Sequence, residues 1–348
     1  MSEWPLLPAG LFALACALLL LLPFLPAWLE WRWPTDSAPL PVPREDGDDP
    51  LARAERVRTR VARLRLAGPG VGYEPVREVD LLDPEAPAAL GGLPVLACRD
   101  VRAVGGFELQ RLFYAMGDVD FHSLTSFHEV MAEGSLTLGA GSRIRRWGHA
   151  DRTLRLGERS LAAGQLGSGQ AIRLERGCCF QRLHAPDLRF GPEPGPAAPA
   201  PDGTAPQPMH ALPGAVQRAP GHWRVEGNCS VPAGSAFAGS LVVTGVLTLG
   251  PGSRVEGSVK AHRGIVVGEA ATVTGAAICP QAIHVLRDAR VGGPLVSESH
   301  LLVRSGARLG LADAPTTVSA AGIVAEEGAV AHGCVRAQDA GVVVGRGV

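Results

Sequence analysis

The side chains in this sequence that could carry out chemistry are mainly histidines, and their surroundings decide what chemistry is open to them. Four of them, His262, His284, His300 and His332, lie in or near one repetitive segment. A histidine that acts as a general base needs a loop beside it that shapes a site for the reacting group. No insertion interrupts residues 223–309. We therefore expect these histidines to face solvent at the corners of a repeat.

Metal and phosphate sites are the other candidates. His122 and His128 could be zinc ligands, but the sequence offers no third obvious partner near them. The seven cysteines are scattered and form no paired CxxC motif. Gly-x-Gly occurs without the following helix that a phosphate-binding loop requires. Acidic residues form no clustered pair, and no serine stands in a nucleophile elbow. The sequence thus predicts no catalytic residue, no metal and no cofactor.

The elements that must position these residues are set by a period of six. From Val225 to Leu309, every sixth residue is apolar at fourteen of fifteen positions, with Ser297 as the exception, although the whole chain is 46% hydrophobic. A second apolar register lies two residues earlier in each repeat. Apolar residues at i and i+2 share one face of a strand. The pattern therefore predicts short strands separated by corners, because a helix would repeat its apolar stripe every 3.6 residues.

A third signal has a period of eighteen and consists of the glycines Gly239, Gly257, Gly275 and Gly293. Three six-residue sides make one turn of eighteen residues, and we expect a glycine with positive φ at one corner of each turn. The predicted fold is all-β, a three-sided β-solenoid whose coils stack by strand pairing.

A less regular array of the same kind precedes this one over residues 90–190. The triplets at 136–138, 154–156 and 172–174 recur at intervals of eighteen residues. Residues 191–221 then hold nine prolines in 31 residues, which is typical of an extended linker without a core. The main solenoid occupies residues 222–348. The linker could separate two solenoids or loop out of one continuous stack, and both arrangements stay open.

Residues 1–33 are expected to anchor the chain in a membrane through one N-terminal transmembrane helix. Leu6 to Leu29 carry no charge, and about 20 apolar residues span a bilayer. A cleaved secretory signal is the alternative, but no Lys or Arg precedes the apolar run. The arginines follow it, so the positive-inside rule predicts a single-pass protein whose C-terminal body is cytoplasmic.

Residues 34–68 read as a Pro-rich, acidic spacer followed by a basic amphipathic helix. Asp49 and Pro50 suit its N-cap and first position, and Gly68 suits its end. Its six arginines are Arg53, Arg56, Arg58, Arg60, Arg63 and Arg65. Two interpretations stay open: the helix packs on the solenoid, or it lies on an anionic membrane surface, where each basic residue contributes about 1 kcal/mol.

Residues 245–261, GVLTLGPGSRVEGSVKA, and their continuation to Gly275 resemble the repeat of bactofilins, the bacterial polymer-forming cytoskeletal proteins. The resemblance covers about residues 240–345. It implies a right-handed β-helix that polymerises end to end without nucleotide and works as a membrane-associated scaffold in cell-envelope processes. The apolar N-terminal segment, the long linker and the upstream array depart from the usual bactofilin pattern.

The predicted function is a membrane-anchored scaffold that self-assembles through its solenoid. It would localise cell-envelope or polysaccharide-synthesis proteins, its expected partners, at the cytoplasmic face of a bacterial inner membrane. The alternative is an enzyme similar to hexapeptide-repeat acyltransferases, acting on a sugar or envelope precursor, because Leu249-Gly250-x-x-Ser253 also satisfies their repeat. The net charge of −1 gives no general argument for nucleic-acid binding.

The predicted assembly surface is the C-terminal strand edge at Val342, Val343 and Val344. No charged tail or covering helix follows these valines in the sequence. An uncapped terminal coil presents unpaired backbone groups and an open core. We therefore expect this edge to add strands from another copy of the chain.

Overall fold

The computed structural model describes residues 6–25, 28, 50–70, 72–75, 93–103, 106–192 and 205–347. The chain divides into two units, Met1–Glu45 and Asp46–Val348. The predicted spacer at residues 34–49 and the middle of the predicted linker, residues 193–204, lie outside the described residues.

The first unit contains the helix α1 (Leu6–Leu21) and the 3-10 turn η1 (Leu22–Phe24). The α-helix ends here because Pro23 has no backbone N–H to donate to the preceding turn. Leu11, Phe12 and Leu19 are all exposed, so the helix presents apolar side chains on several sides. None of the helices in the described part of the chain is both long and apolar enough to cross a membrane.

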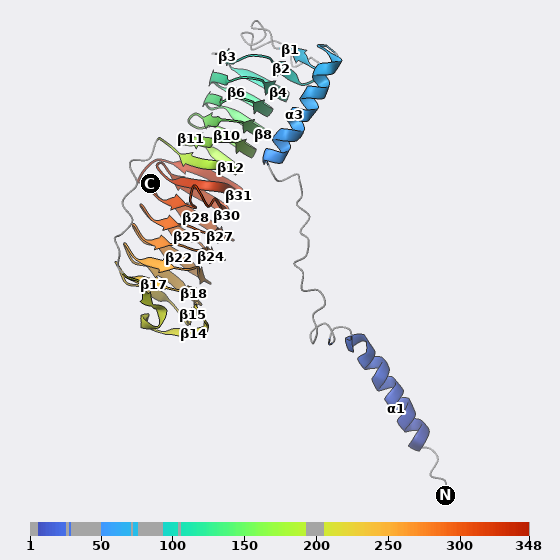
Figure 1. Ribbon diagram of the computed structural model, residues 1–348, viewed down its shortest axis with the longest axis vertical. Coiled ribbons are helices and arrows are strands. Elements are labelled where there is room, and N and C mark those ends of the chain that lie inside the picture. Colours follow the sequence, from blue (N-terminus) through green and yellow to red (C-terminus); the bar gives the residue numbers. More distant parts are fainter. Residues whose placement is uncertain are drawn as a thin grey trace. The chain divides into compact units, whose positions relative to one another are not determined.

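The second unit contains helix α3 (Pro50–Ala67) and an all-β solenoid of about 13 turns with about 18 residues per turn, as the sixfold pattern predicted. Figure 1 shows its coils stacked along one axis. In the first array the strands form two parallel stacks. One stack consists of β2 (Val95–Ala97), β4 (Phe107–Ala115), β6 (Thr125–Ala132), β8 (Arg143–Ala150), β10 (Leu161–Ser168) and β12 (Cys179–Phe190). The other consists of β3 (Val101–Ala103), β5 (Val119–Ser123), β7 (Leu136–Ala140), β9 (Thr153–Leu156) and β11 (Ala171–Leu174).

The second array has three parallel stacks, one for each side of the coil. The first contains β15 (His222–Val225), β18 (Ser240–Val243), β21 (Val259–Ala261), β24 (Ala277–Cys279) and β27 (Leu295–Ser297). The second contains β16 (Cys229–Val231), β19 (Val246–Leu249), β22 (Gly264–Val267), β25 (Ile283–Val285) and β28 (His300–Val303). The third contains β17 (Ala236–Ala238), β20 (Arg254–Glu256), β23 (Thr272–Val273), β26 (Arg290–Val291) and β29 (Arg308–Leu309). The stacks end on β30 (Thr316–Glu326) and β31 (Val330–Val344).

The registers of the second array explain the period in the sequence. Leu241 lies opposite Val259, and Leu247 lies opposite Ile265, so partners in neighbouring coils are eighteen residues apart. The residues of the sixfold registers fill the core, as Val231 and Val255 illustrate with no exposed surface. Each short strand buries every second side chain, because side chains alternate between its two faces. The corner that follows turns the chain into the next side of the coil.

The two arrays form one continuous stack in which they run toward each other. The last strand of the first array, β12, pairs antiparallel with the last strand of the second, β31. After β12 the chain reaches the opposite end of the second array, where β13 (Gln207–Pro208) pairs with β17. Figure 1 shows this order, with β31 next to β12 and β14 (Ala215–Ala219) at the far end. Of the two arrangements left open by the linker, the structure has the continuous stack.

This junction corrects the prediction of an open C-terminal edge. Val342 lies opposite Cys179, and Val343 is buried, so these valines already pair with a strand of the same chain. The valine-rich edge does add a strand, as expected, but that strand is β12 of the first array and not a strand of another copy.

The other end of the second array is closed by residues that the sequence assigned to the linker. The 3-10 turn η3 (Met209–Ala211) brings Met209 into the end of the core, and Leu212 is buried beside it. The strand β14 forms an antiparallel hairpin with β15. Residues 205–221 therefore cap this end of the second array, although the sequence assigned them to the linker at 191–221.

The glycine column has the predicted positive φ at only two of its four members, and the other two have a different physical reason. Gly275 and Gly293 do not have positive φ, whereas a Cβ on Gly275 would lie 2.7 Å from the backbone of Gly257. A Cβ on Gly293 would likewise lie 2.6 Å from the backbone of Gly275. These glycines are required because consecutive coils approach too closely for a side chain. Of the four, Gly239 has φ of 126° and Gly257 has φ of 157°.

The left-handed corner lies elsewhere in the coil. Residues 234, 252, 270, 288 and 306 all have positive φ at an interval of eighteen, and they are Gly, Gly, Ala, Asp and Gly. Their N–H groups donate to the neighbouring coil, as Ala270 does to Arg287 and Asp288 to Ser305. Because two of the five are not glycine, this column was hidden in the sequence.

Candidate functional site

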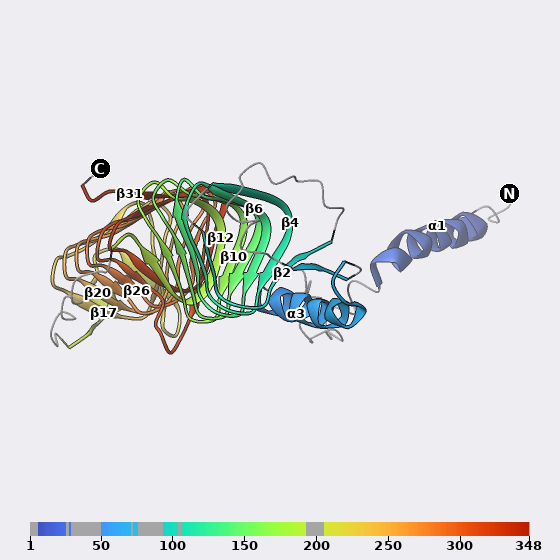
Figure 2. The same ribbon diagram turned by 90° about the horizontal axis from the view of Figure 1, so that it is seen from above.

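Helix α3 (Pro50–Ala67) packs along the flank of the first array (Figures 1 and 2). Its apolar face lies on a column of large side chains that point outward from successive coils. The cluster contains Ala54 and Val61 of the helix and Leu96, Tyr114, Met131 and Trp147 of the array. The helix begins at Pro50 and ends before Gly68, which has φ of 85°, as the sequence predicted. The interpretation in which the helix packs on the solenoid is therefore correct for this face.

Two of the six arginines proposed for membrane contact face the solenoid instead. Arg53 donates to Glu129 at 2.8 Å, and its guanidinium lies 5.1 Å from the centre of the Trp147 ring. Arg58 donates two hydrogen bonds to the carboxylate of Asp151, at 2.7 and 2.9 Å. Both contacts join the helix to the array, so Arg53 and Arg58 are docking residues.

The pKa values of these two arginines reflect the same contacts. Burial lowers the pKa of Arg53, and the opposing attraction of Glu129 does not fully compensate for it. For Arg58 burial acts in the same direction, but the charge and hydrogen bonds of Asp151 raise its pKa overall. Both groups stay cationic at neutral pH, because an arginine guanidinium has an ordinary pKa above about 12.

Beneath the helix, the buried His149 pairs with the partly exposed Asp151. The Nε2 atom of His149 lies 3.1 Å from Oδ1 of Asp151, and its ring stacks on that of Trp147 with centres 5.9 Å apart. Burial lowers the pKa of His149, with Asp151 acting against it and Arg58 adding to it. Asp151 therefore bridges a neutral histidine and the Arg58 guanidinium. Because His149 is only 2% exposed, its ring is closed to a substrate, and its contact orients the carboxylate that binds the helix.

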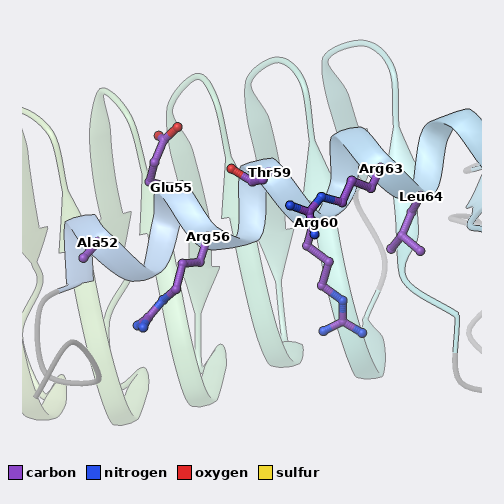
Figure 3. A pocket seen from close by; sticks show the side chains of 7 residues that line it. All are labelled: Ala52, Glu55, Arg56, Thr59, Arg60, Arg63 and Leu64. Atoms are coloured by element: carbon purple, nitrogen blue, oxygen red, sulfur yellow. The ribbon is translucent and has the colours of Figure 1, made fainter.

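The outer face of α3 carries the remaining arginines. Arg56, Arg60 and Arg63 are exposed, and their spacing of four and three residues places them on one side of the helix. Figure 3 shows the shallow hollow on this side, lined by Ala52, Glu55, Arg56, Thr59, Arg60, Arg63 and Leu64. Arg65 is also exposed, and Leu66 is 90% exposed next to it. This face combines positive charge with an apolar residue and has only Glu55 as an acid.

The histidines of the second array are mostly exposed, as predicted, but they do not all lie at corners, because His284 lies within β25 and His300 begins β28. His262, His284 and His300 are exposed on the coil surface. His332 differs, because it is only partly exposed and donates through Nδ1 to the carbonyl oxygen of Pro186 at 2.9 Å. That bond joins β31 to β12, so His332 belongs to the junction.

The two upstream histidines show no metal-binding arrangement. His122 lies 3.8 Å from Asp120 and is exposed, while His128 is partly buried. Within the described ranges no group of three or more His, Cys, Asp or Glu side chains is placed to hold a metal ion.

One hollow was missed in the sequence. A groove of about 460 Å³ lies on the third side of the second array, beside the short insertion that follows Leu309. Its lining includes Thr272, Arg290, Arg308, Leu311 and Ala312. The sequence signal for it was the break in the period near Ala312, which reads as an irregularity rather than as the wall of a groove.

The comparisons with known proteins identify no family. A scan against protein-family models, a search of curated proteins and a search of solved structures each return no match.

Proposed function

We propose that this protein is a membrane-bound scaffold that self-associates through its solenoid. The observation that carries the proposal is the pairing of β12 with β31 within one chain. It shows that the last coil of the first array can bind the last coil of the second array. The resemblance of residues 240–345 to the bactofilin repeat points in the same direction. In this proposal the protein is not an enzyme, and its partners are envelope or polysaccharide-synthesis proteins of a bacterial inner membrane.

Self-association would occur by exchange of this junction between copies. The connection from residue 191 to residue 206 has 16 residues and can extend to about 50 Å. In one chain it needs to pass only about six coils, or roughly 30 Å at about 4.8 Å per coil. The spare length lets the second array of one copy pair with the first array of another, at little cost beyond the ordering of the connection. Repeated exchange produces open chains.

Two features support attachment to a membrane. The leucine-rich helix α1 exposes Leu18, Leu19 and Leu20, which would be unfavourable in water. The outer face of α3 presents Arg56, Arg60 and Arg63, which suit the anionic surface of a cytoplasmic leaflet. Helix α3 would thus contact the solenoid through its inner face and the bilayer surface through its outer face. The solenoid would then lie in the cytoplasm. A C-terminal alkaline-phosphatase fusion should then be inactive in cells.

The test of self-association uses the register of the junction. His184 lies opposite Cys334, and directly opposed strand residues are close enough for a disulfide. One copy carries His184→Cys with Cys334→Ser, and a second copy with a different tag keeps His184 and Cys334. After the purified proteins are mixed and mildly oxidised, exchange yields a cross-linked pair that carries both tags. The matched control is the same mixture without His184→Cys.

The outcomes separate the alternatives. Large assemblies with the mixed cross-link support the scaffold and the exchanged junction. Large assemblies without it would retain the scaffold and move its interface elsewhere. A chain that is monomeric at high concentration would contradict the scaffold, and a discrete trimer would favour the acyltransferase alternative.

A further inference from the structure

One side of the coil carries an uncharged column of residues that crosses the junction of the two arrays. Leu302 lies opposite Val324, and Val324 lies opposite Val342. Val342 in turn lies opposite Cys179 in the first array. Figure 1 shows β22, β25, β28, β31, β12 and β10 in this order along the stack. The column, called the lateral strip below, consists of Val266, His284, Leu302, Val324, Val342, Cys179 and Leu161.

The side chains of the lateral strip point out of the coil. Val266, Leu302 and Val324 are partly exposed, whereas the residues before and after each of them are buried. Leu161, at the first-array end, is 40% exposed. The strip contains no Asp, Glu, Lys or Arg, although 19% of the whole chain is charged. An apolar surface that is continuous over seven strands favours contact with another apolar surface over contact with water.

Charged residues flank the strip at the corners where its strands begin and end. Arg263 immediately precedes β22, and Glu269 lies at the corner after it. In the last coil the order of charge is reversed, because Asp339 precedes the strip and Arg346 follows it. All four side chains are exposed, and none forms an ion pair within the part of the chain that the structure describes. Their charges are therefore available to a partner that lies on the strip.

A second copy of the chain matches this charge pattern when the two stacks lie side by side and parallel. A two-fold axis parallel to the stack brings the leading edge of each strip beside the trailing edge of the other, at the level of the same coil. Arg263 of one copy then faces Glu269 of the other. Asp339 likewise faces Arg346. Each contact occurs twice, so opposite charges meet at both edges of the interface.

The same rotation fits the side chains of the two strips. Gly264 and Ala340 stand two residues before Val266 and Val342, on the same face of the sheet. Val266 of one copy is placed against Gly264 of the other, and Val342 against Ala340. Seven strands and one side of the coil measure about 34 Å by about 15 Å, so the two copies bury about 1,000 Å² in total. That area is about the lower limit for a specific interface.

We propose that the lateral strip is an interface between two parallel copies of this chain. An antiparallel pair centred on Leu302 would set Cys179 and Leu161 against Thr248 and Ser230, so it would bury less apolar surface. This inference deepens the proposed self-association by adding a second contact. It is separate from the exchange of β12 and β31, so either contact can fail without the other.

The experiment is sedimentation velocity of the full-length protein, in one non-ionic detergent throughout because α1 exposes leucines. Arg263→Glu and Glu269→Arg are prepared as separate variants. Alone, each variant sets like charges against each other twice in the dimer, so its dissociation constant should rise at least about 10-fold. In an equimolar mixture the two substituted side chains face each other, and native Arg263 faces native Glu269. The mixture should therefore associate within about threefold of the parent protein.

Two matched controls accompany these variants. Arg218→Glu reverses a charge on exposed β14, away from the strip, and should change association less than about twofold. Val324→Asp should weaken association at least about 10-fold, because it buries a charge in the interface. Val296→Asp makes the same change at a partly exposed valine of β27, outside the strip, and should leave association unchanged. Melting curves establish that each variant is folded.

Recovery of association on mixing supports the parallel lateral interface, because an antiparallel pair would set Arg263 against Asp339 and would not recover. Failure to recover, or association of Arg263→Glu equal to that of the parent, would overturn the inference. The mixed-tag cross-link between positions 184 and 334 is measured in the same samples and reports the exchanged junction alone. Variants that associate like the parent and keep this cross-link would remove the lateral interface and leave the proposed function intact.

Discussion

Val342 lies opposite Cys179 in the antiparallel pair of β12 and β31, and the next residue, Val343, uses both its N–H and its carbonyl oxygen to bond the segment just before β12. The N–H of Gly177 donates to the carbonyl oxygen of Val343 at 2.8 Å, and the N–H of Val343 donates to that of Cys178 at 2.9 Å. Beside them, Gly341 leaves room for the ring of Phe180, which would lie 2.3 Å from a Cβ at that position. The junction is thus a fitted interface between two solenoid ends.

The first prediction concerns this interface. Val343→Lys places a charge at a site with 1% exposure and should lower the free energy of unfolding by about 3 kcal/mol or more. Hydrogen exchange should accelerate first in β12 and β31 and leave the amides of β19 and β22 protected. Val216→Lys, at a valine that is 53% exposed, is the control and should change stability by less than about 0.5 kcal/mol. Equal stabilities of the two variants would mean that the junction is open in solution.

The second prediction separates the two corner columns. Gly275→Ala would place a Cβ 2.7 Å from the backbone of Gly257, so we expect a loss of about 3 kcal/mol in unfolding free energy. Ala270→Gly replaces an alanine by a glycine at a position with φ of 53°. It relieves left-handed strain while it increases the entropy of the unfolded chain, so stability should stay within about 1 kcal/mol of the parent. Urea denaturation of both variants measures the difference, and a harmless Gly275→Ala would remove the steric explanation.

The sequence was sufficient for the coil but not for the way the coils meet. The side-chain period and the register, such as Leu241 opposite Val259, follow directly from apolar spacing, because each strand buries alternate residues. The eighteen-residue spacing that places Gly275 in a column was also visible in the sequence. A pattern of glycines, however, cannot distinguish a need for positive φ from a close approach of two backbones. The junction was hidden because a strand edge such as Val342–Val344 carries no information about which partner will cover it.

The same limit applies to the candidate surfaces. The amphipathic pattern of α3 predicted an apolar face, and Val61 is buried there. The arginines could not be sorted from the sequence, because Arg58 and Arg60 differ only in whether Asp151 lies opposite them in the fold. The groove was missed because its arginines, Arg290 and Arg308, come from separate coils that only the register brings together.

The third prediction uses that difference between two arginines. Arg58→Gln removes an ion pair with Asp151 that is about one-third exposed, so it should cost about 1 kcal/mol in unfolding free energy after screening. Arg60→Gln should leave stability unchanged and weaken binding of the full-length protein to phosphatidylserine vesicles about fivefold, the equivalent of about 1 kcal/mol. Vesicles of phosphatidylcholine alone provide the reference for apolar binding through α1. If both variants lose vesicle affinity equally, the outer face of α3 has no special role at the membrane.

The last prediction concerns the pH dependence of the α3 contact. Burial lowers the pKa of His149 in the folded protein below its ordinary value of 6.5. Between that folded value and 6.5 the unfolded chain binds a proton at this site that the folded chain does not, so stability falls as pH decreases through this window. The contribution is fully present above about pH 6.5, and the loss is complete once the pH is below the folded pKa. We expect urea denaturation to show this decrease between pH 7.5 and pH 5.5, and His149→Gln to flatten it even if the variant is less stable throughout. Carboxylates with depressed pKa values act at lower pH, because their ordinary values are about 4. A slope in the same window that is unchanged in His149→Gln would show that another group titrates there and that His149 is not the buried neutral histidine beneath α3.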